Sequence, residues 1–170
     1  MLRIKTVPIQ AMRILIGPLC LTAATLPVPA SATPGSGFVG TQVAKGLYGP
    51  MDVKGEKTAT WDLFLKTKAD SDVYVIRNAI AIDGHSGWHT HPGPSLITVT
   101  VGEVVVYDGE NPLCTPTVHR AGDGIIDIGG GDVHLIRNES GAPAETVAVQ
   151  FLPRGAARRQ DKPKPTNCPF

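Results

Sequence analysis

Three of the five histidines in this 170-residue chain are spaced like ligands of a single metal ion. His89 and His91 flank Thr90 as an H-x-H pair, and residues i and i+2 of an extended segment point to the same face. His134 lies on a different expected strand and would supply a third imidazole. Three imidazoles leave coordination positions open for water or a small ligand. We therefore expect a metal centre formed by His89, His91 and His134.

The strands that would position these histidines are predicted by short apolar and β-branched runs between turn residues. Gly and Pro number 19 and 15, which favours turns over long helices, and no segment beyond residue 32 keeps a 3.6-residue apolar period. The expected strands cover residues 38–44, 59–65, 73–82, 95–101, 103–107, 117–120, 125–128, 133–137 and 145–152. Many short strands with glycine-rich turns predict a single all-β barrel domain.

The first 32 residues have the pattern of a cleaved secretory signal. Basic residues precede an apolar run over residues 14–26, and Ala30-Ser31-Ala32 has the small-x-small pattern that a signal peptidase cleaves. A membrane anchor is the alternative, but glycine and prolines interrupt the run, which is shorter than the ~20 residues of a spanning helix. We predict a signal peptide at 1–32, a barrel at 33–152 and a tail at 153–170, in an exported protein that is periplasmic or secreted.

Two details of this leader stay open. The chain could start at Met1 or at Met12, because Met12-Arg13 followed by the apolar run is already a complete signal. Cys20 would be the lipidated residue of a lipoprotein signal, but Leu19 precedes it where such a signal has a small residue. In either case, no membrane span is expected after cleavage.

Cys114 and Cys168 are the two cysteines beyond the leader, and an even number in an exported protein indicates a disulfide. The bond would tie the Pro-rich basic tail, residues 153–170, to the barrel. The alternative is two free thiols, either of which could bind a metal. A basic run such as this tail is usually solvated.

Charge and motifs exclude several function classes. The formal net charge is +1 and aromatic residues make up 5% of the chain, so no nucleic-acid partner is expected. The chain contains no P-loop, dinucleotide fingerprint or nucleophile elbow. The histidine cluster is therefore the one feature of the sequence that points to chemistry.

Around the histidines, the sequence resembles the two motifs of the cupin superfamily. Residues 84–95 read GHSGWHTHPGPS and are followed by Gly102, which resembles the first motif. Gly122, residues 129–134 (GGGDVH) and Asn138 resemble the second. The resemblance covers residues 73–152, and residues 88–95 with the Asn167-Cys168-Pro169 end are similar to small exported single-domain bacterial cupins. It implies a jelly-roll β-barrel, and it leaves open a homodimer formed through edge strands.

Two positions depart from the cupin pattern. Gly129 replaces a proline in a turn, a change that we expect to cost little, and Ser95 replaces the glutamate ligand of many cupins. The resemblance then implies three neutral imidazoles around a divalent Fe, Mn, Ni, Zn or Cu ion, whose identity imidazole ligands do not decide. The lost carboxylate makes the site more positive and favours an anionic substrate. Asp132, two residues before His134, is either a fourth ligand or a turn cap.

Two further histidines are expected outside the ligand set. His85 precedes the H-x-H pair, where it would lie at the mouth of the site and could carry protons, and His119 is expected to face solvent.

Three functions remain open at this point. The first is a metal-dependent oxygenase acting on a small organic molecule, because cupins with three histidines and no glutamate include thiol dioxygenases. The second is a non-catalytic module of the cell envelope that binds a metal or a small ligand. The third is a metal-free barrel that keeps its histidines without using them.

Overall fold

The structure is a computed structural model that describes residues 32–170. The expected leader lies outside the described residues except for Ala32, and its cleavage stays a prediction. Within the described range, the chain forms strands and no helix, so no helix there is long and apolar enough to cross a membrane. The strands are β1 (Ser36–Tyr48), β2 (Asp52–Lys54), β3 (Phe64–Lys66), β4 (Ser71–His85), β5 (His89–Thr90), β6 (Ser95–Val101), β7 (Glu103–Asp108), β8 (Thr117–Arg120), β9 (Gly124–Asp127), β10 (His134–Arg137), β11 (Ala144–Pro153) and β12 (Gln160–Asp161).

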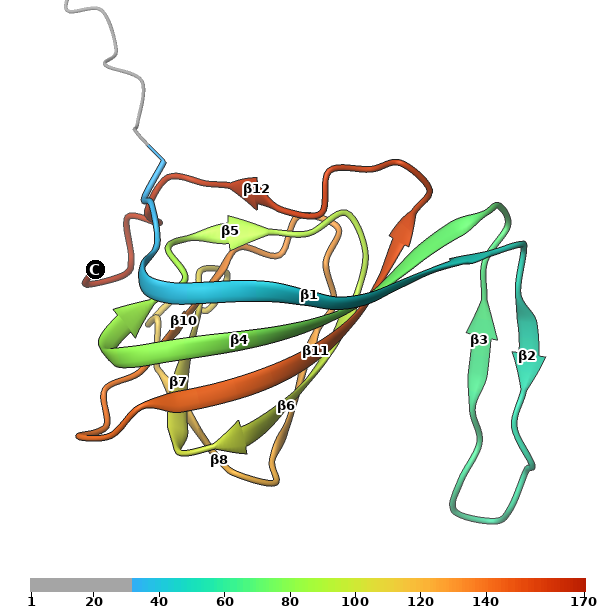
Figure 1. Ribbon diagram of the computed structural model, residues 1–170, viewed down its shortest axis with the longest axis horizontal. Coiled ribbons are helices and arrows are strands. Elements are labelled where there is room, and N and C mark those ends of the chain that lie inside the picture. Colours follow the sequence, from blue (N-terminus) through green and yellow to red (C-terminus); the bar gives the residue numbers. More distant parts are fainter. Residues whose placement is uncertain (1–31) are drawn as a thin grey trace, which may run out of the picture.

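Two antiparallel layers face each other and form a nearly closed barrel (Figure 1). One layer has the order β1-β4-β11-β6-β9, and the other has the order β12-β5-β10-β7-β8. The layers are joined where Arg137 of β10 pairs with His85 at the end of β4. The prediction of an all-β barrel is confirmed.

Most barrel strands match the expected ranges, but β2, β5 and β12 were not among them, and two expected segments differ. β4 continues through the expected turn at Asp83 and Gly84, because β1 and β10 both pair with His85 at its end. The strand expected at 59–65 is mostly wrong, since only Phe64–Lys66 forms β3. β2 and β3 make a hairpin that projects from the barrel (Figure 1). Its large apolar side chains, Trp61 among them, are exposed, so the apolar run there does not mark the core.

The core has two parts, because β10 and β7 are covered on both faces. The inner cluster fills the barrel, and its members include Ile76, Ile97 and Ile136. The outer cluster contains Trp88 and Leu135, and it is closed by the C-terminal segment. Leu135 and Ile136 are successive residues on opposite faces, which explains why β10 is buried along its length.

A disulfide joins Cys114 to Cys168 within the outer cluster. Their Cα atoms are 5.2 Å apart, and the bond spans 54 residues of sequence. The predicted pairing is therefore present, and the alternative of two free thiols that could bind a metal is wrong. The disulfide holds the tail against the outer face of β5, β10 and β7.

Candidate metal centre

The three histidines meet at one end of the inner cavity because of their strand positions. His89 begins β5 and lies directly opposite His134, the first residue of β10. His91 follows β5 by one residue and shares the face of His89, while Thr90 points away. Ligand-capable atoms of the three side chains lie within 4.8 Å of one another, and each residue is 5% exposed. The structure therefore brings together all three residues expected from the sequence.

Hydrogen bonds to backbone carbonyls orient two of the rings. His89 Nδ1 lies 2.9 Å from the Gly87 carbonyl oxygen, and His91 Nδ1 lies 2.6 Å from the Arg158 carbonyl oxygen. A carbonyl oxygen only accepts, so each Nδ1 must carry the proton and donate it. Each Nε2 then carries a lone pair, as in metal-binding histidines, and that of His91 also lies 3.4 Å from the Gln150 side-chain nitrogen.

The His134 ring fits a bound metal for a different reason. Both of its nitrogens are buried and lack a hydrogen-bond partner among the described residues. A buried polar atom without a partner costs about 1–3 kcal/mol, and such atoms in native proteins call for an explanation such as a bound ion. Coordination of a metal by one nitrogen would remove part of that cost.

Burial also keeps the imidazoles of His89 and His91 neutral. It lowers the pKa of His89 to about 2, with a smaller contribution from the nearby His134. Burial likewise lowers the pKa of His91, against the opposing hydrogen bond to Arg158. A metal binds the neutral imidazole, so His89 and His91 need not lose a proton at neutral pH to act as ligands.

A cavity of about 320 Å³ opens beside the three histidines. That volume lies at the small end of the range for ligand pockets, so it suits a small organic molecule. Its walls combine apolar side chains of the inner cluster with many polar and charged groups. The residues that line it include Ile76, Ile97, Ile136, Asn78, Gln150, Arg158 and Arg159.

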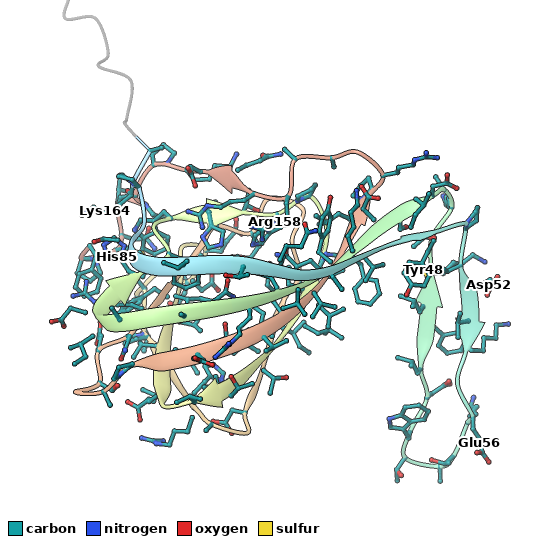
Figure 2. The ribbon with its side chains drawn as sticks, viewed as in Figure 1. Tyr48, Asp52, Glu56, His85, Arg158 and Lys164 are labelled. Atoms are coloured by element: carbon teal, nitrogen blue, oxygen red, sulfur yellow. A yellow bond between two sulfur atoms is a disulfide. The ribbon has the colours of Figure 1, made fainter. Side chains whose placement is uncertain are left out.

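The C-terminal tail runs along this cavity: most of its residues are exposed, as expected of a basic run, but Arg158 and Arg159 are half-buried and line the cavity. β12 pairs with β5, and the carbonyl of Arg158 holds His91. Figure 2 shows Arg158 on the side of the barrel where β5 and β12 run. Tail residues reach the site because the strand pairing and the disulfide both fix them there. A run of basic residues in a sequence does not indicate such pairing.

The two arginines of the tail have different partners. Arg159 pairs with Asp161 at 2.6 Å and donates to the Ser86 carbonyl. Arg158 donates to the Gln150 side-chain oxygen at 3.0 Å and makes no ion pair within residues 32–170. It is half-buried, and burial together with Arg159 lowers its pKa. A guanidinium without a counter-ion beside a cavity is a ready partner for an anion.

Asp127 is a further buried group at the site, and our sequence analysis overlooked it. It is 4% exposed and lies on β9, directly opposite Ser95 of β6. Its Oδ2 is 3.8 Å from His91 Nε2, and its Oδ1 is 3.8 Å from His134 Nδ1. The alternation of the run Ile125 to Ile128 was the available signal, because it places Asp127 on the inward face beside Ile125.

Four further residues singled out in the sequence do not join the three histidines. Asp132 is half-buried and approaches Asp127 and His134, but it does not group with His89 or His91. Ser95 is fully buried and donates to Asp127 at 2.9 Å. His85 is not among the residues that line the cavity, although it was expected at its mouth, and His119 is half-buried rather than solvent-facing.

Gly129 and Asn138 of the second motif shape the site without entering it. Gly129 has φ +65°, which proline cannot adopt, so this glycine is required rather than a change of little cost. Its N–H donates to Asp127 Oδ1 at 2.8 Å. Asn138 is fully buried, and its amide donates to three backbone carbonyls that include that of Ile80. It therefore ties the end of β10 to β4.

Comparisons with known proteins find similarity to this chain only at the level of the fold. No family model matches the sequence, and no curated protein matches it. Solved structures do match. A cupin-like protein from Thermotoga maritima has 16% identity and a TM-score of 0.47, over 54% of this chain and 65% of that one. An uncharacterised Klebsiella pneumoniae protein with a double-stranded β-helix domain has 25% identity and a TM-score of 0.44, over 68% and 86%.

A predicted oxalate decarboxylase from Thermotoga maritima also matches, with 22% identity and a TM-score of 0.41, over 51% of this chain and 84% of that one. This chain spans about two thirds of the length of the first Thermotoga protein. Scores of this size add no argument about activity. The solved structures that this chain is similar to are thus cupin-like and double-stranded β-helix proteins.

Proposed function

We propose that this chain is an exported metal protein whose three-histidine centre binds a small organic anion and oxidises it in a dioxygenase-like reaction. The observation that carries the proposal is His134, whose two buried nitrogens lack hydrogen-bond partners within residues 32–170 and lie beside two imidazoles that are each protonated at Nδ1. A divalent ion held by His89, His91 and His134 would act as a Lewis acid and, if it were iron, would also bind O₂.

Arg158 and Gln150 support an anionic ligand. The Arg158 guanidinium lines the cavity without a carboxylate partner among the described residues, and Gln150 holds it by accepting one of its N–H groups. An anion in the cavity would lie between this guanidinium and the metal ion. The apolar side chains of Ile76, Ile97 and Ile136 on its wall would lower the local dielectric and so strengthen both attractions.

Export is the second part of the proposal. A disulfide persists in oxidising compartments such as the periplasm or the extracellular space, and the chain has one between Cys114 and Cys168. This agrees with a cleaved signal at residues 1–32, a barrel at 33–152 and a tail at 153–170. A homodimer through edge strands remains a separate prediction from the sequence resemblance.

Elemental analysis of protein purified from its native compartment tests the metal. We expect close to one equivalent of a transition metal in the wild type and a large loss in His134→Ala. Less than about a tenth of an equivalent in the wild type, in a site otherwise suited to tight binding, would refute the proposed function. Full metal content in His134→Ala would refute the ligand assignment.

Binding and turnover of an anion are tested with the iron-loaded protein. We expect O₂ uptake with some member of a panel of small thiol and diketone acids, and Arg158→Gln should raise the apparent KM. Arg154→Gln is the matched control, because Arg154 lies in the same tail but pairs with Asp70. Tightly held metal without any O₂ uptake would favour the non-catalytic binding module instead.

A further inference from the structure

The inner face of the barrel holds a carboxylate close to the place where the first motif lacks one. Ser95 occupies the position of the expected glutamate and is fully buried on β6. Asp127 is its direct cross-strand neighbour on β9, and its side chain points to the same interior. Directly opposed residues of an antiparallel pair have Cβ atoms only about 5 Å apart. An acid at Asp127 can therefore reach much of the space that an acid at Ser95 would reach.

Asp127 is as far from two of the histidines as two ligands of one metal ion are from each other. Its Oδ2 is 3.8 Å from His91 Nε2, the unprotonated nitrogen of that ring, and its Oδ1 is 3.8 Å from His134 Nδ1. Bonds of about 2.1 Å to one ion place pairs of ligand atoms roughly 3 to 4 Å apart. A single ion can thus contact Asp127 together with His91 and His134 after small side-chain movements.

The surroundings of Asp127 lack a permanent cation. Ser95 and the Gly129 N–H each donate one hydrogen bond to it, but no lysine or arginine of residues 32–170 pairs with it. A buried carboxylate is stable only when it is paired or coordinates a metal. Among the described residues, its basic partners are the imidazoles of His91 and His134, which are also groups that would hold the ion.

We propose that Asp127 is the carboxylate ligand of the centre, so that β9 supplies the acid that β6 lacks. This rests on the proposed function, because it requires a metal ion at the three histidines. Ser95 then serves as a positioning residue whose hydroxyl holds Oδ2 of Asp127. Asp132, the alternative ligand from the sequence, is half-buried and, unlike Asp127, forms no close pair with any of the three histidines within residues 32–170, so it stays outside the coordination set.

Cobalt(II) alone is the probe that tests this assignment, since its visible absorption bands report coordination number and ligand type without turnover. We expect Asp127→Asn to weaken Co²⁺ binding by about 100-fold in chelator competition, beyond the usual effect of an outer-shell partner, and to shift the bands. Asp132→Asn, the matched control, should bind within about threefold of the wild type with unchanged bands. Circular dichroism of each metal-free variant checks the fold.

The double variant Ser95→Glu, Asp127→Ser, called the exchange variant, is a second test of the assignment. It moves the carboxylate from β9 back to β6, and we expect it to recover most of the affinity lost in Asp127→Asn. It also decides the question if Asp127→Asn does not fold. Bands and affinity in Asp127→Asn equal to those of the wild type would overturn the proposal for Asp127. A folded exchange variant that binds no better than Asp127→Asn would overturn it as well. Failure of the wild type to bind Co²⁺ would instead overturn the proposed metal function.

Discussion

Removal of the disulfide should loosen the tail and the metal centre together. The double variant Cys114→Ser, Cys168→Ser cuts a crosslink that spans 54 residues. By the chain-entropy relation, a closed loop of this length stabilises the folded state by about 4 kcal/mol. Both cysteines are buried in the outer cluster with Trp88, whose Nε1–H donates to the Phe170 carbonyl at 2.9 Å. Loss of the crosslink therefore frees a segment that also covers part of the core.

Urea unfolding followed by circular dichroism measures this effect. We expect the double variant to lose roughly 3–4 kcal/mol and, for a domain of this size, to melt roughly 10–20 °C lower. The reduced wild type should match it, which separates loss of the crosslink from the serine substitutions. Metal affinity should also fall, because the tail carries the Arg158 carbonyl that orients His91.

A loss of less than about 1 kcal/mol would refute this reasoning, since the tail would then be held by β12 and local packing rather than by the crosslink. Lower stability with unchanged metal affinity would refute the second part alone. In that case, the His91 ring would keep its orientation without the disulfide.

Two further predictions concern the histidines and the second-motif turn. In metal-free protein, the free energy of unfolding should fall as the pH drops below about 6.5. His89 takes up a proton there in the unfolded state, whereas burial keeps it unprotonated in the folded state. The slope for this one group approaches about 1.4 kcal/mol per pH unit, and denaturant melts of wild type and His89→Gln at several pH values should differ by it. Identical slopes would contradict the low pKa of His89. Gly129→Ala should destabilise the protein by about 3 kcal/mol or more, because φ is +65° and a Cβ would collide with the Gly93 carbonyl. Gly130→Ala is its control, since the φ there is similar, +70°, but a Cβ meets nothing within 4 Å, and equal losses in thermal melts would show that the collision does not matter.

Local pattern was sufficient for the histidine cluster and the barrel strands. The H-x-H spacing places His89 and His91 on one face of any extended segment, wherever that segment lies. The alternating runs over residues 95–101 and 145–152 coincide with β6 and with most of β11, because one face of each strand lies on the core. Metal binding itself stays a prediction that the sequence pattern and the geometry both support.

Apolar content alone was misleading at the projecting hairpin. Residues 59–65 read as a core strand, yet Trp61 and Phe64 are exposed, since this segment pairs only with β2 and packs against no second layer. Burial depends on what covers a strand, and composition does not record that.

The sequence by itself determined which histidines could share a metal and where most of the barrel strands lie. The tertiary structure alone decided that β9 lies beside β6, which brings Asp127 to Ser95. It also decided that the tail returns along β5, which brings Arg158 to His91. Residue types and their periodicity predict on which face of its strand a side chain lies. Register and strand order depend instead on packing between segments that are distant in sequence. The acid and the guanidinium of this site both depend on that second kind of information.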